Sequence, residues 1–131
     1  MERIIKFRGK DLIHNEWIFG GIATDGKNNI VILPKKDWSK GGCVDESTVG
    51  QFTGMYDKYR KEIYENDIVE AWSQGQKAIG LVKQRKDGLW LIYPAWQNGD
   101  FWCFKPDEYG HDTVEVIGNI HDNPELLKHN E

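Results

Sequence analysis

The chain has 131 residues, a mass of 15.2 kDa and a formal net charge of −4. This length predicts one domain with a hydrophobic core of its own, and no apolar run approaches the roughly 20 residues that a membrane helix needs. The negative net charge argues against a general nucleic-acid binder, because phosphate groups are bound by basic surfaces.

The charges are unevenly spread along the chain. Residues 1–10 carry four basic residues and one acidic residue, whereas residues 99–131 carry two basic and eight acidic residues. The balances are therefore +3 and −6. Three interpretations remain open: the two ends attract each other, copies of the chain associate head to tail, or the two charged faces never meet.

The first residues, M-E-R-I-I-K-F-R-G-K-D, intersperse charges among apolar side chains and contain no signal-peptide core. Cys43 and Cys103 lie far apart in the sequence and are interpreted as reduced, small hydrophobic residues and not as a disulfide. The sequence therefore predicts a cytoplasmic protein.

Strand patterns dominate the first half of the chain. R-I-I-K-F predicts a strand with Ile5 and Phe7 on one face. E-W-I-F-G-G-I-A and N-N-I-V-I-L-P flank T-D-G-K-N, in which Asp25 and Gly26 are predicted to supply the positive φ angles of a tight hairpin. Residues 35–47 are rich in Gly, Lys and Ser and indicate a surface loop, which a short extended piece follows.

The second half of the chain shows the same strand patterns. D-I-V-E-A-W predicts one strand, and A-I-G-L-V-K-Q with L-W-L-I-Y-P-A-W predicts a second hairpin that turns at Asp87 and Gly88. F-W-C-F is a candidate buried strand, and T-V-E-V-I-G-N-I places Val114 and Val116 on one face. Turns recur about every eight to twelve residues, which is typical of a sandwich or small barrel, and the abundant aromatic residues favour β structure.

One short helix is predicted at the C-terminus, in H-D-N-P-E-L-L-K-H-N. Asn123 can cap it, Pro124 suits the first helical position, and Glu125 complements the positive end of the helix dipole. We expect Leu126 and Leu127 to cover one open end of the barrel.

Three ordered blocks carry a resemblance to a known family. They are I-K-F-R-G-K-D near the start, T-V-G-Q-F-T-G-M-Y-D-K-Y-R-K-E-I-Y-E-N-D-I-V-E-A-W in the middle, and V-E-V-I-G-N-I-H-D-N-P-E-L-L near the end. In this order they resemble the YopX family, whose members are small proteins of bacteriophages and prophages with no established biochemical activity. The resemblance implies a single, mainly β domain over residues 1–131. It comprises an N-terminal β-hairpin subregion (1–53) and an SH3-like small β-barrel subregion (54–131).

Two positions depart from the family pattern. Asn66 stands where relatives have Gly, and Asn is among the few other residues that adopt positive φ at modest cost, so we predict a left-handed Asn66. Tyr59 and Arg60 stand where relatives commonly have Asn-Gly. Because neither suits positive φ, we predict a looser or different turn there, and an exposed joint over residues 54–67.

Metal and acid–base sites have weak support in the sequence. His111-Asp112 and His121-Asp122 flank one predicted strand, roughly 33 Å apart, and are interpreted as solvated turn residues. Charged residues cluster in the middle block, but none is tied to a nucleophile, a metal motif or a phosphate-binding loop; they are Asp57, Lys58, Lys61, Glu62, Glu65 and Asp67. The sequence predicts no enzymatic activity and no cofactor.

Two binding hypotheses remain. The first is a protein-interaction module that binds a partner or forms a homo-oligomer, with the charged turn as its candidate interaction loop (Asp57, Lys58, Tyr59, Arg60 and Lys61). The alternative is a barrel that binds single-stranded nucleic acid, with bases stacked on aromatic side chains beside basic ones. Its candidate residues are Lys83, Arg85, Lys86 and Trp90, with Tyr93 and Trp96 nearby.

Overall fold

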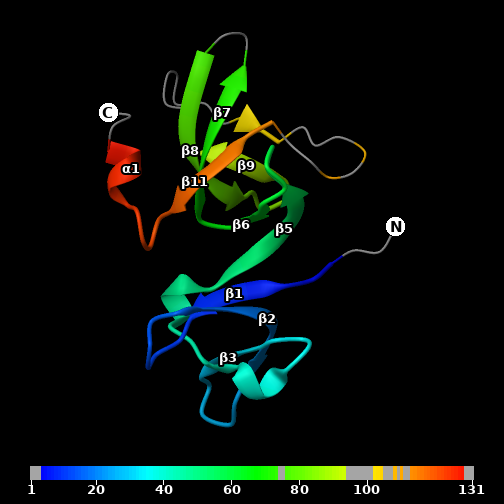
Figure 1. The fold of residues 1–131 in the computed structure, drawn as a ribbon, viewed down its shortest axis with the longest axis vertical. Helices are drawn as coiled ribbons and strands as arrows, with labels where there is room; N and C mark the ends of the chain where they lie inside the picture. Colours follow the sequence, from blue (N-terminus) through cyan, green and yellow to red (C-terminus); the bar gives the residue numbers. More distant parts are fainter. Residues whose placement is uncertain are drawn as a thin grey trace. The chain divides into compact units, whose positions relative to one another are not determined.

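The computed structural model describes residues 4–73, 76–93, 102–104, 108, 110 and 113–128. The fold of these residues is mainly β, as predicted, and they form antiparallel strands, two short 3-10 turns and one short helix (Figure 1). The chain divides into two compact units, Met1–Phe52 and Thr53–Glu131. Within the described residues, no helix has both the length and the apolar character needed to cross a lipid bilayer.

The first unit is an antiparallel sheet with the strand order β4-β3-β2-β1-β5. Its strands are β1 (Phe7–Lys10), β2 (Trp17–Thr24), β3 (Ile30–Leu33), β4 (Gly42–Cys43) and the start of β5 (Gly50–Tyr56). β1 begins later than the sequence pattern predicts, because its pairing with β2 runs from Phe7 opposite Gly20 to Lys10 opposite Trp17. Fully buried side chains of this unit include Ile32 and Phe52.

The β2–β3 hairpin is confirmed, but its turn differs from the predicted one. The positive φ falls on Asn28 (66°), and not on Asp25 or Gly26. The Asp25 carboxylate accepts the backbone N–H groups of Lys27 (2.8 Å) and Asn29 (3.0 Å), which satisfies the donors of a longer loop. The hydrogen bond from the Asn29 backbone is the largest cause of the lowered pKa of Asp25.

The second unit contains a five-stranded antiparallel sheet with the order β10-β9-β8-β7-β11. The strands of this unit are the end of β5, then β6 (Glu62–Tyr64), β7 (Asp67–Ser73), β8 (Gln76–Gln84), β9 (Trp90–Tyr93), β10 (Trp102–Cys103) and β11 (Glu115–Asn119). Within the described residues this sheet is open, so the expected closed barrel is wrong. The outer edge of β11 forms hydrogen bonds with a loop. Lys58 N–H donates to Val114 O (2.9 Å), and Val116 N–H donates to the Asp57 carboxylate (3.0 Å).

Two local predictions for this unit are confirmed in outline. β8 and β9 form the second hairpin, and Gly88 provides the left-handed residue of its turn (φ 94°). The C-terminal helix α1 (Glu125–Lys128) is short. The predicted cap is wrong in its chemistry: Asn123 accepts the Leu126 N–H through its backbone oxygen, while its side chain accepts from Asn119 N–H.

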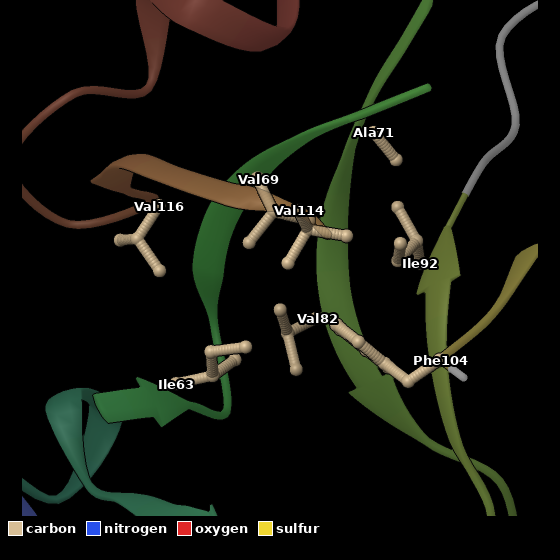
Figure 2. Close-up of a cluster of buried hydrophobic side chains, with 8 residues drawn as sticks. All are labelled: Ile63, Val69, Ala71, Val82, Ile92, Phe104, Val114 and Val116. Carbon is tan, nitrogen blue, oxygen red and sulfur yellow. The ribbon is translucent and has the colours of Figure 1, made fainter. Parts of the chain in front are cut away.

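The core of the second unit lies on one face of its sheet. Figure 2 shows the cluster, whose members lie in β6, β7, β8, β9 and β11 or next to a strand (Phe104 after β10 and Val114 before β11): Ile63, Val69, Ala71, Val82, Ile92, Phe104, Val114 and Val116. The predicted alternation around β11 is confirmed, since Val114 and Val116 are buried while Glu115 is half-exposed. Each fully buried Val or Ile contributes about 1.5–3 kcal/mol relative to exposure.

Residues 54–67 form the exposed joint that the sequence suggested only in part, because residue 54 and residues 58–61 are exposed while others are buried. Ile63 and Asp57 are 0 % and 1 % exposed, and Tyr64 and Asp67 are also buried. The Asp67 carboxylate accepts the Tyr64 N–H at 2.8 Å, which closes the turn that holds Asn66. The predicted left-handed Asn66 is confirmed, with φ at 72°.

Arg60 contradicts the second turn prediction, because its φ is 67°. Arg60 N–H donates to Asp57 O (2.9 Å) and Asp57 N–H to Lys61 O (2.8 Å), so the turn is as tight as one with Gly. A left-handed backbone costs a residue with a Cβ roughly 1–2 kcal/mol, and Asp57 imposes this cost on Arg60 by fixing the loop ends.

We expect Arg60→Gly to raise the free energy of unfolding by about 0.5–1 kcal/mol, because glycine removes the steric cost of positive φ. Urea unfolding followed by tryptophan fluorescence measures the change. Asn66→Gly is the matched control and should change stability less, since Asn already tolerates this region. A less stable Arg60→Gly protein would contradict the strain at this position.

Candidate interaction surface on the first unit

The predicted interaction loop, residues 57–61, is organised around a buried carboxylate. Asp57 Oδ1 accepts the backbone N–H groups of Tyr59 and Lys61, each at 2.8 Å, and Oδ2 accepts that of Val116 at 3.0 Å. With both oxygens engaged and the residue 1 % exposed, Asp57 stabilises the loop and is not presented to a partner. The side chain of Tyr59 is exposed (68 %), and Lys58 Nζ lies 5.2 Å from its ring centroid.

The other carboxylates of this block also have structural partners. Asp67 is buried against the Tyr64 N–H, and Glu62 accepts the Tyr64 hydroxyl at 2.9 Å. Among the residues that the structure describes, no three His, Cys, Asp or Glu side chains gather where a metal ion could bind. His121 and Asp122 follow β11, where Asp122 accepts the Asn119 amide (3.0 Å); His111 and Asp112 lie outside the described residues.

The basic residues of the hairpin in the nucleic-acid hypothesis lie in two different environments. Lys83 and Lys86 are exposed, whereas Arg85 is held by Asp87 through Nε–Oδ1 (3.0 Å) and Nη2–Oδ2 (2.6 Å) contacts. The Arg85 hydrogen bond is the largest cause of the lowering of the Asp87 pKa to about 2. Trp90 is half-buried and packs against the core cluster.

Tyr93, at the end of β9, is half-exposed (50 %), and Trp96 lies outside the described residues. In the β8–β9 register Lys83 stands opposite Leu91 and Gln84 opposite Trp90, so Lys83 and Trp90 lie on opposite faces of the sheet, whereas Lys83 and Tyr93 share one face.

A hollow of about 440 Å³ lies on the first unit. Two loops and the start of β2 form its walls, with the lining residues Asp11, His14, Glu16, Trp17, Ile18, Phe19, Pro34 and Lys40. Both loops also carry large apolar side chains in solvent. They are Leu12 (61 % exposed), Ile13 (84 %) and Trp38 (73 %). We call these three residues and the hollow the loop surface.

Asp11 shapes the loop over residues 11–16. Its Oδ1 accepts the backbone N–H groups of His14 (2.9 Å) and Glu16 (3.1 Å), and its Oδ2 lies 3.2 Å from the His14 ring nitrogen Nδ1. The Glu16 hydrogen bond is the largest cause of the lowered pKa of Asp11. Asn15 takes the left-handed φ of 57°, so the polar residues close the turn and leave Leu12 and Ile13 in solvent.

Asp37 shapes the second loop, over residues 34–41. Its carboxylate accepts the Ser39 N–H (3.2 Å) and caps the 3-10 turn η1 (Trp38–Lys40). Gly41 ends this turn where space is short, because a Cβ there would lie 2.4 Å from the Ile32 carbonyl oxygen. Trp38 is thus held on an ordered turn with its side chain in solvent.

Trp17 forms one wall of the hollow and lies beside two cations of β1. The Arg8 guanidinium carbon and Lys10 Nζ are 4.5 Å and 5.4 Å from the Trp17 ring centroid. Arg8 and Lys10 stand opposite Phe19 and Trp17 in the register, so these four side chains share one face of the sheet. Cation–π contacts of this kind fix the orientation of the ring.

Sequence reasoning missed the loop surface, because it treated residues 35–47 only as a surface loop. The available signal was K-K-D-W-S-K, a tryptophan inside a lysine-rich turn, where a large apolar residue has no core to join. Leu12 and Ile13 gave a similar signal, since they precede the polar turn H-N-E.

Comparisons with known proteins found one matching family and a similar solved structure. The sequence model of the family described as "YopX protein" matches residues 6–128. The crystal structure of protein EF1440 from Enterococcus faecalis is similar, with 23 % sequence identity and a TM-score of 0.53; the match covers 96 % of this chain and 99 % of that one. No curated protein matches the sequence.

Proposed function

The chain belongs to the YopX protein family, and we propose that it is a non-enzymatic module that binds a protein partner through the loop surface of its first unit. The observation that carries the proposal is the exposure of Leu12, Ile13 and Trp38 on the two loops that border one hollow. Exposed apolar groups beside a concave surface mark protein-binding sites, and tryptophan is enriched among the residues that contribute most to binding.

The order of the two loops supports binding as well. The Asp11 carboxylate accepts two backbone N–H groups and the Asp37 carboxylate accepts one, each within its own loop, so the apolar side chains stand on short, hydrogen-bonded turns. A surface that is ordered before it binds loses less conformational entropy on association. The partner in this proposal is either another protein or a second copy of the chain.

Single-stranded nucleic acid remains the weaker alternative. Lys83 and Lys86 are exposed, but Arg85 is engaged by Asp87 and Trp90 packs on the core, which leaves few groups for phosphate contacts and base stacking. The family resemblance suggests a phage or prophage setting. We place the module in the cytoplasm, where Cys43, which forms no disulfide in the described structure, would stay reduced.

Site-specific photo-crosslinking in the native host tests the proposal. A photoreactive phenylalanine analogue replaces Trp38, Ile13 or, as the control, Tyr59, which is comparably exposed on the second unit (68 % against 73 % for Trp38). We expect discrete protein adducts from positions 38 and 13 and none from position 59. An adduct of twice the chain mass would identify a second copy as the partner. Adducts from position 59 alone, or from no position, would overturn the proposal.

A further inference from the structure

The loop over residues 34–41 carries an unbalanced positive charge around its exposed tryptophan. Lys35, Lys36 and Lys40 flank Trp38, against the single carboxylate of Asp37. Lys35 and Lys36 are exposed, and neither forms an ion pair with a described residue. The local balance is therefore +2 in a chain whose net charge is −4.

The one acid of this loop is largely occupied by the loop itself. Asp37 accepts the N–H and the hydroxyl of Ser39, and Lys40 Nζ lies 4.0 Å from its second carboxylate oxygen. Because Lys40 remains 78 % exposed, this contact leaves its charge in solvent. The loop therefore presents an exposed apolar ring that three lysines flank in the sequence.

We propose that the segment bound by the loop surface is an acidic peptide, with an apolar side chain that packs on Trp38 while its carboxylates face Lys35, Lys36 and Lys40. This inference rests on the proposed function and names the chemistry of the partner. Complementary charges at the rim of an interface mainly raise the association rate and the specificity, whereas a buried aromatic ring contributes most of the affinity.

The carboxylates that line the hollow decide between an acidic peptide and a nucleic acid. Asp11 and Glu16 line it together with Lys40, and hydrogen bonds lower the pKa of Asp11. A long polyanion that followed the hollow would meet these carboxylates, whereas a short peptide can place its acids on the lysine side alone. The two further cations beside the hollow, Arg8 and Lys10, lie against the Trp17 ring and are buried and half-buried, so they offer little charge to a phosphate backbone.

Peptide selection on the full-length protein tests the inference. A display library of random twelve-residue peptides is selected on the immobilised native chain, and the recovered peptides are sequenced. We expect Asp and Glu to be enriched next to an aromatic residue or Leu. A recovered set without excess acid, or no recovered peptide at all, overturns the inference.

The dominant peptide is then labelled and titrated by fluorescence anisotropy. We expect Lys35→Gln, Lys36→Gln and Lys40→Gln, combined in one variant, to weaken binding about 10-fold or more, and Trp38→Ala to weaken it at least as much. The matched control combines Lys61→Gln, Lys83→Gln and Lys86→Gln, which removes the same charge from exposed positions of the second unit and should change affinity less than about 2-fold.

Competing ligands and the crosslinking result complete the test. Twelve-nucleotide oligo-dT and anionic phosphatidylglycerol vesicles are measured in the same buffer. Tighter binding of either one with the same lysine dependence, or equal losses in the two triple variants, overturns the acidic peptide. If crosslinks form at positions 38 and 13 while this test fails, the proposed function stands and only the acidic preference falls.

Discussion

Asp57→Ala is expected to lower the free energy of unfolding by about 3 kcal/mol or more. The substitution removes the acceptor of three backbone N–H groups, those of Tyr59, Lys61 and Val116. Asp57 is 1 % exposed, so water does not readily replace the lost acceptor. An unsatisfied buried donor costs about 1–3 kcal/mol, and the bond to Val116 also joins the loop to β11.

Asp57→Asn keeps the shape of the side chain but replaces one of its two acceptor oxygens by a donor nitrogen. An amide oxygen can still accept from Tyr59 and Lys61, but the amide nitrogen then faces the Val116 N–H, so one donor loses its acceptor. We expect a smaller loss of about 1–2 kcal/mol and faster hydrogen exchange at Val116 than at Tyr59.

Urea unfolding followed by tryptophan fluorescence and by amide exchange measures both variants. Asp87→Ala is the control, because Asp87 also accepts a backbone N–H in a hairpin (Leu89, 3.2 Å) but is 57 % exposed on its side chain. Its removal should cost less than about 1 kcal/mol. Equal losses for Asp57→Ala and Asp87→Ala would show that the Asp57 carboxylate does not stabilise the loop.

The local backbone conformation was predictable from the sequence where the type of a single residue determines it. The left-handed Asn66 and the Gly88 turn follow from residue types that tolerate positive φ, and the alternation around β11 follows from the two-residue period of a strand. Arg60 was not predictable in this way, because four hydrogen bonds between Asp57 and residues 59–61 outweigh the preference of one residue. Tertiary contacts override local propensity at such positions.

Contacts between distant residues account for the errors in the sheet. The closed barrel fails because Lys58 and the Asp57 carboxylate bind the edge of β11, across more than fifty residues of sequence. The sequence did not reveal the loop surface for a related reason. Whether an apolar side chain of a loop is exposed depends on whether the core has room for it, and distant residues decide that. The structure shows that the Trp38 side chain is 73 % exposed, whereas the sequence does not decide whether this side chain is buried or exposed.

Gly20→Ala is expected to destabilise the first unit by about 3 kcal/mol and to abolish binding at the loop surface. A Cβ at Gly20 would lie 2.1 Å from the Leu33 carbonyl oxygen, 2.5 Å from its carbon and 2.8 Å from Pro34 Cα. All three are backbone atoms, so no side chain can move aside. The neighbouring pair, Gly21 opposite Leu33, is part of the β2–β3 ladder that would have to shift.

Gly26→Ala provides the matched control, because the same substitution there meets nothing within 4 Å. Its stability should stay within about 0.5 kcal/mol of the native value in urea unfolding. Because Pro34 begins the loop that bears Trp38, the Gly20 variant should also lose the selected peptide while the Gly26 variant keeps it. Equal stability of the two variants would mean that the β2–β3 ladder yields at Leu33, and that the Trp38 loop does not depend on this close approach for its position.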